Sequence, residues 1–428
     1  MYFNNIQKIT FEGPQTQNPL GYRYYQSDKK ILGKTMAEHL RLAICFWHTF
    51  CWQGSDIFGD GTFNREWLKE PNSLKRAENR ASAAFEFISK LTVPFFTFHD
   101  RDVSPEDNNI KVTRNNLLHM QDVLAMHMEK TGIKLLWGTA NLFSHPRYAA
   151  GAATNPNPEI FAVAASQVKQ AMDMTHALKG ENYVLWGGRE GYDTLLNTDL
   201  KKELNHYARF LHLVAEYKHK IGFKGALLIE PKPCEPTKHQ YDFDTATVYA
   251  FLSKHQLEKE FKVNIEGNHA TLAGHSFEHE VAMAYAYDIF GSIDANQGDP
   301  QLGWDTDQFP TDIRTNTAVL YQMLLHGGFS TGGFNFDTKL RRQSLDSDDL
   351  FYGTISGIDG FAKGLENAAK LIVDEKIKTM CEARYQHWNN TEIVNMNLEA
   401  LDNYVSEKSL NPKAVSGKQE LLEMLSDV

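Results

Sequence analysis

The chain has 428 residues, of which 44 are Lys or Arg and 54 are Asp or Glu, so its formal net charge is −10. Nucleic-acid binding normally needs basic side chains gathered on one face, and here they never gather beyond pairs such as Lys29-Lys30 and Arg341-Arg342. We therefore expect no nucleic-acid partner.

A hydrophobic content of 42% with 12% aromatic residues is typical of a globular protein with a substantial core. No apolar run approaches the roughly 18 residues of a membrane span, and residues 1–11 lack the features of a signal peptide. We expect a cytoplasmic protein without membrane contact. The cysteines show no CxxC pairing, which predicts reduced, mostly buried thiols at Cys45, Cys51, Cys234 and Cys381.

Eight short runs rich in β-branched and aromatic residues predict strands. Their starts are roughly 41 residues apart on average, which suits one strand and one helix per unit. The runs are Ala43–Phe50, Val93–Phe98, Lys134–Trp137, Tyr183–Trp186, Ala226–Ile229, Lys262–Ile265, Gly291–Ile293 and Gly333–Phe336.

Segments between these strands carry apolar residues at helical spacing, for example 81–91, 117–130, 160–178 and 200–219. Alternating strands and helices imply parallel strands joined by right-handed crossovers, and eight such units can close into a barrel. The alternative, a doubly wound open sheet, would carry a Gly-rich phosphate turn after its first strand, and none follows Phe50. We predict an α/β fold, a parallel (β/α)8 TIM barrel over residues 37–374.

The two ends differ from the barrel in character. Residues 1–36 form a polar N-terminal extension that we expect to lie over the barrel. Residues 375–428 alternate helical pieces with breaks and are too sparsely apolar for a core of their own. Their apolar residues are nevertheless regularly spaced, so we predict a helical C-terminal arm that packs against another subunit.

Polar groups concentrate where the predicted strands end, which is where barrels of this type carry their chemistry. Six carboxylates and one imidazole gather there: Glu230, Glu266, His269, Asp294, Asp305, Asp307 and Asp337. Singly, each is more often a helix cap or a solvated loop residue, but their coincidence at successive strand ends favours a shared site. Such a cluster would repel itself without cations, and carboxylate oxygens suit Mg²⁺ or Mn²⁺ better than zinc. We predict two divalent ions bridged by Glu266.

Other signals are less specific. The run Gly187–Gly191 lacks the Lys-Ser or Lys-Thr of a phosphate loop, so no nucleotide cofactor is expected. Trp52, Trp137 and Trp186 could be core residues or a ligand platform. Phe58 lies in a polar, Gly-rich loop, where an aromatic residue is either a buried anchor or a partner contact.

Three motifs resemble the xylose isomerase family along nearly the whole chain. Phe98-His99-Asp100-Arg101-Asp102 is similar to one family signature, Leu228–Pro233 followed by Glu235-Pro236 is similar to a second, and the Trp186–Gly191 run agrees as well. The length and N-terminal extension resemble the longer class of the family. The resemblance implies reversible aldose-ketose isomerisation, of D-xylose to D-xylulose and also of D-glucose to D-fructose, by ring opening and a metal-assisted 1,2-hydride shift.

Carried over to this chain, the resemblance implies a first ion on Glu230, Glu266, Asp294 and Asp337, and a second on Glu266, His269, Asp305 and Asp307. The ions would be Mg²⁺, Mn²⁺ or Co²⁺. His99, oriented by Asp102, would assist ring opening, and Lys232 would hydrogen-bond the oxygen on C1. Trp52, Trp186 and a neighbouring subunit's Phe58 would form an apolar wall around the sugar. The resemblance further implies a homotetramer and a cis peptide at Glu235-Pro236.

Three alternatives are weighed against this interpretation. Another aldose-ketose isomerase on the same barrel, of the rhamnose type, would keep the metal rim. A metal-dependent barrel hydrolase would share the ligands but would need basic residues for phosphate, and Lys232 and Arg189 are nearly alone on the predicted rim. A non-enzymatic sugar-binding barrel would lack the pair His99 and Asp102.

Overall fold

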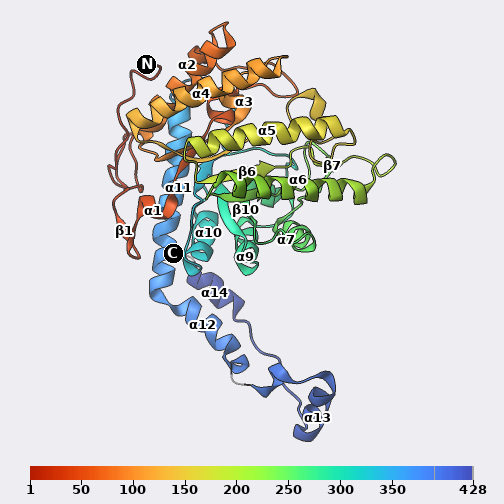
Figure 1. Ribbon diagram of the computed structural model, residues 1–428. Coiled ribbons are helices and arrows are strands. Elements are labelled where there is room, and N and C mark those ends of the chain that lie inside the picture. The colour runs from red at the N-terminus through yellow and green to blue at the C-terminus, as the bar shows by residue number, and fades with distance from the viewer. Residues whose placement is uncertain (390, 427–428) are drawn as a thin grey trace.

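The protein is described by a computed structural model that covers residues 1–389 and 391–426. Within this part, eight parallel strands form a closed barrel surrounded by helices (Figure 1), which confirms the predicted (β/α)8 fold. The last strand pairs with the first, with Asn335 opposite Ala43 and Phe336 opposite Ile44. In barrel order the strands are β3 (Ala43–Cys45), β4 (Phe95–His99), β5 (Lys134–Thr139), β6 (Asn182–Trp186), β8 (Ala226–Glu230), β10 (Phe261–Glu266), β11 (Phe290–Asp294) and β12 (Phe334–Phe336).

The helices around the barrel begin and end at residues suited to those positions. The side chain of Asn109 caps the second long helix by accepting the N–H of Lys111, and that helix ends at Gly132 with a positive φ of 76°. The helices between the strands and after the barrel are α2 (Ser73–Leu91), α3 (Asp100–Val103), α4 (Ile110–Thr131), α5 (Pro158–Ala177), α6 (Leu200–Ile221), α7 (Thr245–Lys254), α8 (Gly267–Leu272), α9 (Phe277–Ala286), α10 (Ile313–Leu325) and α11 (Asp349–Asp374).

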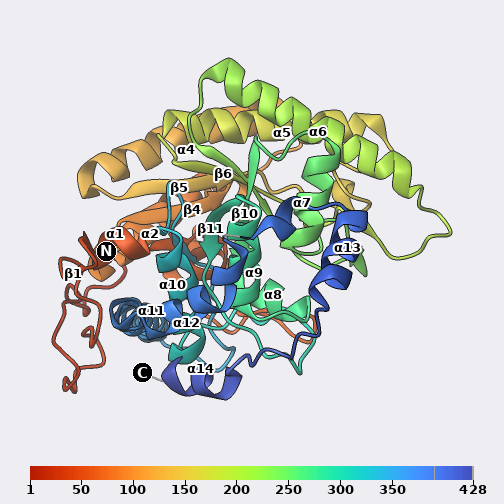
Figure 2. The ribbon, with the colours of Figure 1, turned by 90° about the horizontal axis from the view of Figure 1, so that it is seen from below.

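The core has two parts, because strand side chains alternate between the two faces of the barrel wall. Most buried apolar residues lie between strands and helices, and they include aromatic residues such as Phe87, Phe96 and Phe361. A smaller cluster of strand residues, including Trp137 and Leu228, belongs to the inside of the barrel. The view in Figure 2 shows the strands at the centre and the long helices around them. The barrel thus supplies a rigid support for the residues that follow its strands.

The first predicted strand is too long. β3 ends at Cys45, and Trp47–Cys51 form a single π-helical turn in which the N–H of Cys51 bonds to the carbonyl of Phe46. The aromatic residues of this segment suggested an extended strand, but Phe50 instead packs against Phe87 of α2, with ring centroids 5.6 Å apart. The predicted end at Phe50 is therefore wrong, since tertiary packing overrides the local preference for strand.

The prediction of mostly buried cysteines is also wrong. All four thiols are free, and Cys45 is the buried one, whereas Cys51 and Cys234 are partly exposed and Cys381 is exposed. Cys381 lies in the helix α12 (Lys376–Tyr385), where the structure buries no side chain. The absence of paired cysteine motifs from the sequence indicates free thiols, but it does not indicate how far each thiol is buried.

The N-terminal segment lies along the outside of the barrel. It includes the strands β1 (Lys30–Ile31) and β2 (Lys34–Thr35) and the helix α1 (Met36–Leu40). The carboxylate of Asp359 in α11 accepts the backbone N–H groups of Arg23, Tyr24 and Tyr25 at 2.7 to 2.9 Å. These charge-assisted bonds fasten the segment to the last barrel helix.

The chain after α11 extends away from the barrel and returns near its side (Figure 1). It contains α12, α13 (Leu398–Lys408) and α14 (Gln419–Ser426), and within the described residues none of these three helices buries a side chain. Trp388, Leu398 and Val415 are 60%, 84% and 80% exposed. This segment is referred to below as the C-terminal arm.

Candidate active site and metal centre

A cavity of about 550 Å³ opens at the carboxyl ends of the strands. Every site residue predicted from the sequence lines it except Phe58. The cavity is also lined by residues that the sequence did not identify: Trp47, His48, Asn141, Phe143, Glu235 and Lys339. Trp137, which the sequence allowed as either a core residue or part of a ligand platform, lines it too. No described helix is both long and apolar enough to cross a membrane.

The acidic residues of the rim lie in overlapping groups that could each hold an ion. Glu266, Asp294 and Asp337 form one group, in which one ligand atom from each lies within 4.8 Å of the others. Glu266 also groups with Asp305 and Asp307, and Nε2 of His269 lies 3.0 Å from Oε2 of Glu266. Glu266 therefore stands between two sets of ligands.

The electrostatics of the rim fit divalent cations. Burial, followed by repulsion from neighbouring carboxylates, raises the pKa of Asp294 to about 7. The same causes raise the pKa of Glu230 and Asp337 well above the usual range. Among the described residues, Oδ2 of Asp294 has no hydrogen-bond partner. Buried carboxylates that repel one another and leave an acceptor free are suited to hard cations.

A layer of asparagines beneath the rim holds these carboxylates. Asn264 donates to Oε2 of Glu230 at 2.8 Å, and Asn335 donates to Oδ1 of Asp294 at 2.9 Å. Asn296 donates to Oε1 of Glu266 at 2.7 Å. Sequence reasoning missed this layer, although Asn264 and Asn335 each precede a rim carboxylate by two residues, the spacing that brings side chains to one face of a strand. Such bonds fix the orientation of ligand oxygens.

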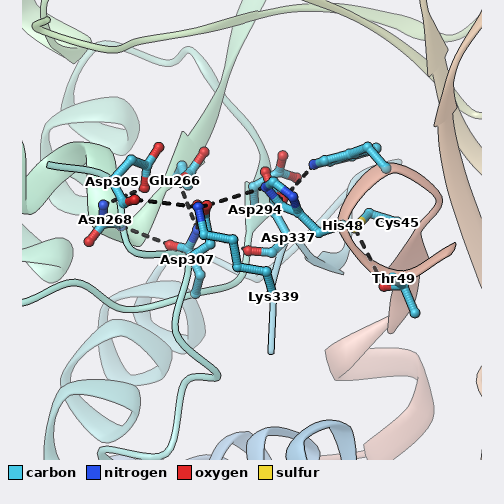
Figure 3. Close-up of polar contacts among 12 residues, drawn as sticks. Cys45, His48, Thr49, Glu266, Asn268, Asp294, Asp305, Asp307, Asp337 and Lys339 are labelled. Carbon is cyan, nitrogen blue, oxygen red and sulfur yellow. Dashed lines mark hydrogen bonds and ion pairs between the residues drawn. The ribbon is translucent and has the colours of Figure 1, made fainter. Parts of the chain in front are cut away.

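Two further side chains, Lys339 and His48, contact the rim carboxylates (Figure 3). Nζ of Lys339 lies 2.6 Å from Oδ2 of Asp307. Nε2 of His48 lies 3.2 Å from the same oxygen and 3.3 Å from Oδ1 of Asp337. Burial opposes the charge of Lys339, but Asp307 outweighs it and raises the pKa of this lysine. The ammonium group of Lys339 therefore neutralises part of the acidic rim.

His99 and Asp102 lie in contact at the end of β4. Nδ1 of His99 is 2.9 Å from Oδ2 of Asp102, and both side chains are buried. The ring of Trp47 packs edge-on against His99 at 4.5 Å, and its Nε1 donates to Oδ1 of Asp337 at 2.7 Å. Trp47 thus links the imidazole to the acidic rim. With the end of β3 placed at Cys45, the position of Trp47 two residues later would have indicated a site residue.

Lys232 reaches the other side of the cavity. Its Nζ lies 2.7 Å from Oδ2 of Asp305 and 3.3 Å from Oε2 of Glu235. Burial lowers the pKa of Lys232, but these carboxylates and Glu266 outweigh burial and raise it above its usual value. The ammonium group therefore remains a donor at neutral pH. The predicted cis peptide at Glu235-Pro236 is confirmed.

Aromatic rings line the rest of the cavity. Phe143 packs edge-on against Trp186 at 4.5 Å and against His99 at 5.4 Å. Trp52 lines the cavity mouth, where its Nε1 donates to the carbonyl of Ser55 at 2.9 Å. Phe58 is 88% exposed and does not line the cavity of its own chain.

Fold and site together define a class of protein, a (β/α)8 barrel in which one cavity holds a His–Asp pair and a cluster of carboxylates that could bind metal ions. A scan against models of protein families finds no match. Curated relatives named xylose isomerase match almost the whole chain. One from Paraburkholderia phytofirmans is 59% identical over 99% of this chain and 97% of the relative, and one from Haemophilus influenzae is 59% identical over 99% and 98%.

The chain therefore belongs to the xylose isomerase family. Solved structures with low sequence identity share its fold. An L-ribulose 3-epimerase aligns over 78% of this chain and 97% of its own, with a TM-score of 0.52 and 14% identity. A D-psicose 3-epimerase from Clostridium cellulolyticum aligns over 76% and 99%, with a TM-score of 0.51 and 11% identity.

Proposed function

We propose that the chain is a xylose isomerase, which interconverts D-xylose and D-xylulose and also D-glucose and D-fructose. The observation that carries this proposal is that the His99–Asp102 pair faces the acidic rim across one cavity. Relatives at 59% identity over nearly the whole chain are named for this activity. A cavity that combines an acid-base pair, carboxylates and aromatic rings is suited to a sugar substrate.

The residues that would hold the cations are those of the rim. Glu230, Glu266, Asp294 and Asp337 would hold the first, and Glu266, His269, Asp305 and Asp307 would hold the second. When bound, Mg²⁺, Mn²⁺ or Co²⁺ supplies Lewis-acid stabilisation of charge that develops on the sugar oxygens. His269 is held for this role by the contact of its Nδ1 with the carbonyl of Pro231 at 2.9 Å, which leaves Nε2 facing the rim.

The first step is the opening of the cyclic sugar. His99 moves a proton between the ring oxygen and the anomeric hydroxyl through Nε2. Its Nδ1 bond to Asp102 supports this role, because that bond fixes the tautomer with Nε2 directed toward the cavity. Trp47 limits rotation of the imidazole by packing against it.

The second step moves a hydrogen between C1 and C2 of the open sugar as a hydride, and a proton from the oxygen on C2 to the oxygen on C1, so that the aldehyde becomes an alcohol and the C2 alcohol a ketone. Lys232 donates a hydrogen bond to the oxygen on C1, where negative charge develops. The rings of Trp186 and Phe143 exclude water from this side of the cavity, which keeps the transferred hydrogen from exchanging with solvent. Trp52 supplies a third apolar surface at the mouth.

We also propose that the active form is a homotetramer. The C-terminal arm, residues 375–428, would pack on a neighbouring subunit, since its apolar side chains are exposed in one chain. Phe58 would enter the cavity of a neighbouring subunit. Its loop is suited to this because Arg342 holds Asp56 at 3.1 Å and thereby presents Phe58 outward.

A barrel hydrolase acting on phosphate esters has less support. Such an enzyme needs free basic groups for the phosphate, whereas Lys232 is paired with Asp305 and Lys339 with Asp307. Another aldose-ketose isomerase, of the rhamnose type, remains the alternative against which the substrate must be tested.

The test is to strip the protein of metal with a chelator and to incubate it with xylose, glucose or rhamnose and each divalent ion separately. We expect xylulose to form with Mg²⁺, Mn²⁺ or Co²⁺ and xylose to be the best of the three sugars. The variant Glu266→Gln serves as a control with an impaired rim. Faster turnover of rhamnose, or xylulose formation without any ion, would contradict the proposal. Running the reaction in deuterated water distinguishes hydride transfer from an enediol route, which would place deuterium on the product carbon.

A further inference from the structure

Two imidazoles and a buried carboxylate meet at the start of α9, outside the active-site cavity. His275 lies in the loop between α8 and α9, and His279 and Glu280 lie in the first turn of α9. One ligand atom from each lies within 4.8 Å of the other two. Nδ1 of His275 is 2.6 Å from Oε1 of Glu280, and the two imidazole rings are 4.7 Å apart.

The surroundings hold the carboxylate and one imidazole in place. Glu280 is 3% exposed, and its Oε2 accepts the backbone N–H of Thr245 at 2.9 Å, so Oε1 is left to face His275. Nε2 of His275 lies 4.0 Å from Oδ2 of Asp244. At this distance the pair is an ion-pair contact and not a hydrogen bond, and it would have to shorten for Asp244 to orient an imidazole that binds a metal through Nδ1.

We propose that His275, His279 and Glu280 form a transition-metal site, with Zn²⁺ as the ion and water as the fourth ligand. Two nitrogen ligands and one carboxylate suit zinc, whereas Mg²⁺ prefers oxygen ligands throughout. Ligands of a tetrahedral zinc lie about 3.4 Å from one another, given bond lengths of about 2.1 Å. The bond between His275 and Glu280 would therefore open slightly, and His279, whose side chain is exposed, would rotate toward the ion.

The site lies close to the catalytic metal centre but does not share its residues. The backbone N–H of His275 bonds to the carbonyl of Ala270, the residue that follows His269 in α8. A cavity of about 10 Å³, enough for a single water molecule, is lined by Asp244 and Glu280 together with Glu266 and His269. A bound ion would tie the loop after α8 to the start of α9, and through the bond of Glu280 to Thr245 also to the start of α7, and so stabilise the helix that carries His269.

The test compares zinc content between variants of the full chain loaded with Mg²⁺. The wild type, His279→Gln and His219→Gln are incubated with a small excess of Zn²⁺, freed of unbound ion and analysed for metal. His219 is a matched control, because this exposed imidazole contacts a single carboxylate, Oε2 of Glu260, at 2.8 Å. Any zinc exchange at the catalytic rim occurs equally in all three proteins.

We expect the wild type and His219→Gln to retain one more Zn²⁺ per chain than His279→Gln. Anomalous diffraction at the zinc edge should place the extra ion between His275, His279 and Glu280. Zinc should also raise the melting temperature of the wild type more than that of His279→Gln. Equal zinc content in the three proteins, or an anomalous peak confined to the catalytic rim, would overturn the proposal.

Discussion

A single carboxylate oxygen, Oδ2 of Asp102, accepts two hydrogen bonds from His99. It lies 2.9 Å from Nδ1 of the imidazole and 2.8 Å from the backbone nitrogen of the same residue. Asp102 therefore fixes both the ring and the backbone at the end of β4. The three-residue spacing of the pair permits this because α3 begins at Asp100 and turns Asp102 back toward the strand.

The first prediction concerns this pair. His99→Asn should lower turnover of the cyclic sugar about 100-fold or more, because the proton transfer of ring opening is lost. A substrate supplied in open-chain form should be affected much less, since hydrogen transfer does not need His99. Stopped-flow measurements with freshly generated open-chain sugar would show the difference. Equal losses for both forms would remove the ring-opening role.

The second prediction concerns Trp47. Trp47→Phe keeps the edge-on contact with His99 but removes the hydrogen bond to Oδ1 of Asp337. Loss of a bond that orients a metal ligand should weaken divalent cation binding roughly 10-fold to 100-fold. Calorimetric titration of the metal-free protein would measure this. Trp52→Phe is the matched control, because the indole of Trp52 donates to a backbone carbonyl and not to the rim; a similar loss in both variants would contradict the prediction.

The third prediction concerns metal removal and stability. Stripping the cations should lower the melting temperature, because the buried carboxylates of the rim are then left to repel one another. Bound ions at 1,000 times their dissociation constant stabilise a protein by about 4 kcal/mol per site. Thermal scans with and without Mg²⁺ measure the effect. The prediction fails if the scans coincide.

The fourth prediction follows from a buried carboxylate outside the rim. Asp242 is 3% exposed, and neither of its oxygens has a partner among the described residues. Burial is the main cause that raises the pKa of Asp242 from 3.8 to about 7, and the negative charge of Glu190 adds to it. The folded protein therefore holds a proton that the unfolded chain releases, and this contribution to stability is lost as the pH rises from about 4 through about 7.

The corresponding measurement compares the wild type with Asp242→Asn by denaturant unfolding at pH 5 and pH 8. The variant cannot ionise, so its stability relative to the wild type should rise with pH, by an amount on the order of 4 kcal/mol at most. The metal rim is the same in both proteins and its own pH dependence cancels. A stability difference that does not change between the two pH values would show that Asp242 titrates normally.

The fifth prediction tests the shared active site. Phe58→Ala should change the stability of the isolated chain by less than about 0.5 kcal/mol, since the side chain is 88% exposed. Activity should nevertheless fall if Phe58 closes a neighbour's cavity. Ile57→Ala is a control at the adjacent position, which is 92% exposed. The test is to measure the steady-state activity of both variants and to follow their oligomeric state by light scattering. Full activity in Phe58→Ala would contradict an active site shared between subunits.

The barrel and most of the residues that line its cavity could be predicted because both follow regular rules. Strands alternate with helices, and polar residues at strand ends converge in a barrel. Glu230, Glu266 and Asp294 are each the last residue of their strand, and Asp337 follows β12 directly. Their clustering follows from the sequence once the strands are located.

The remaining lining residues could not be predicted because they depend on how loops return. Trp47 and His48 were hidden in an aromatic run that resembles a strand but forms a π-helical turn. Lys339 lies beyond β12 and reaches Asp307, 32 positions earlier in the chain.

The pairing of β12 with β3 has a consequence for biosynthesis. Ala43 is made early, but its partner Asn335 emerges from the ribosome only after nearly three hundred further residues. During synthesis the edge of β3 that later pairs with β12 therefore remains unpaired, and it can pair with other chains or bind chaperones. Asp337 follows that last strand by one position, so the chain completes its acidic rim and closes its barrel at almost the same moment.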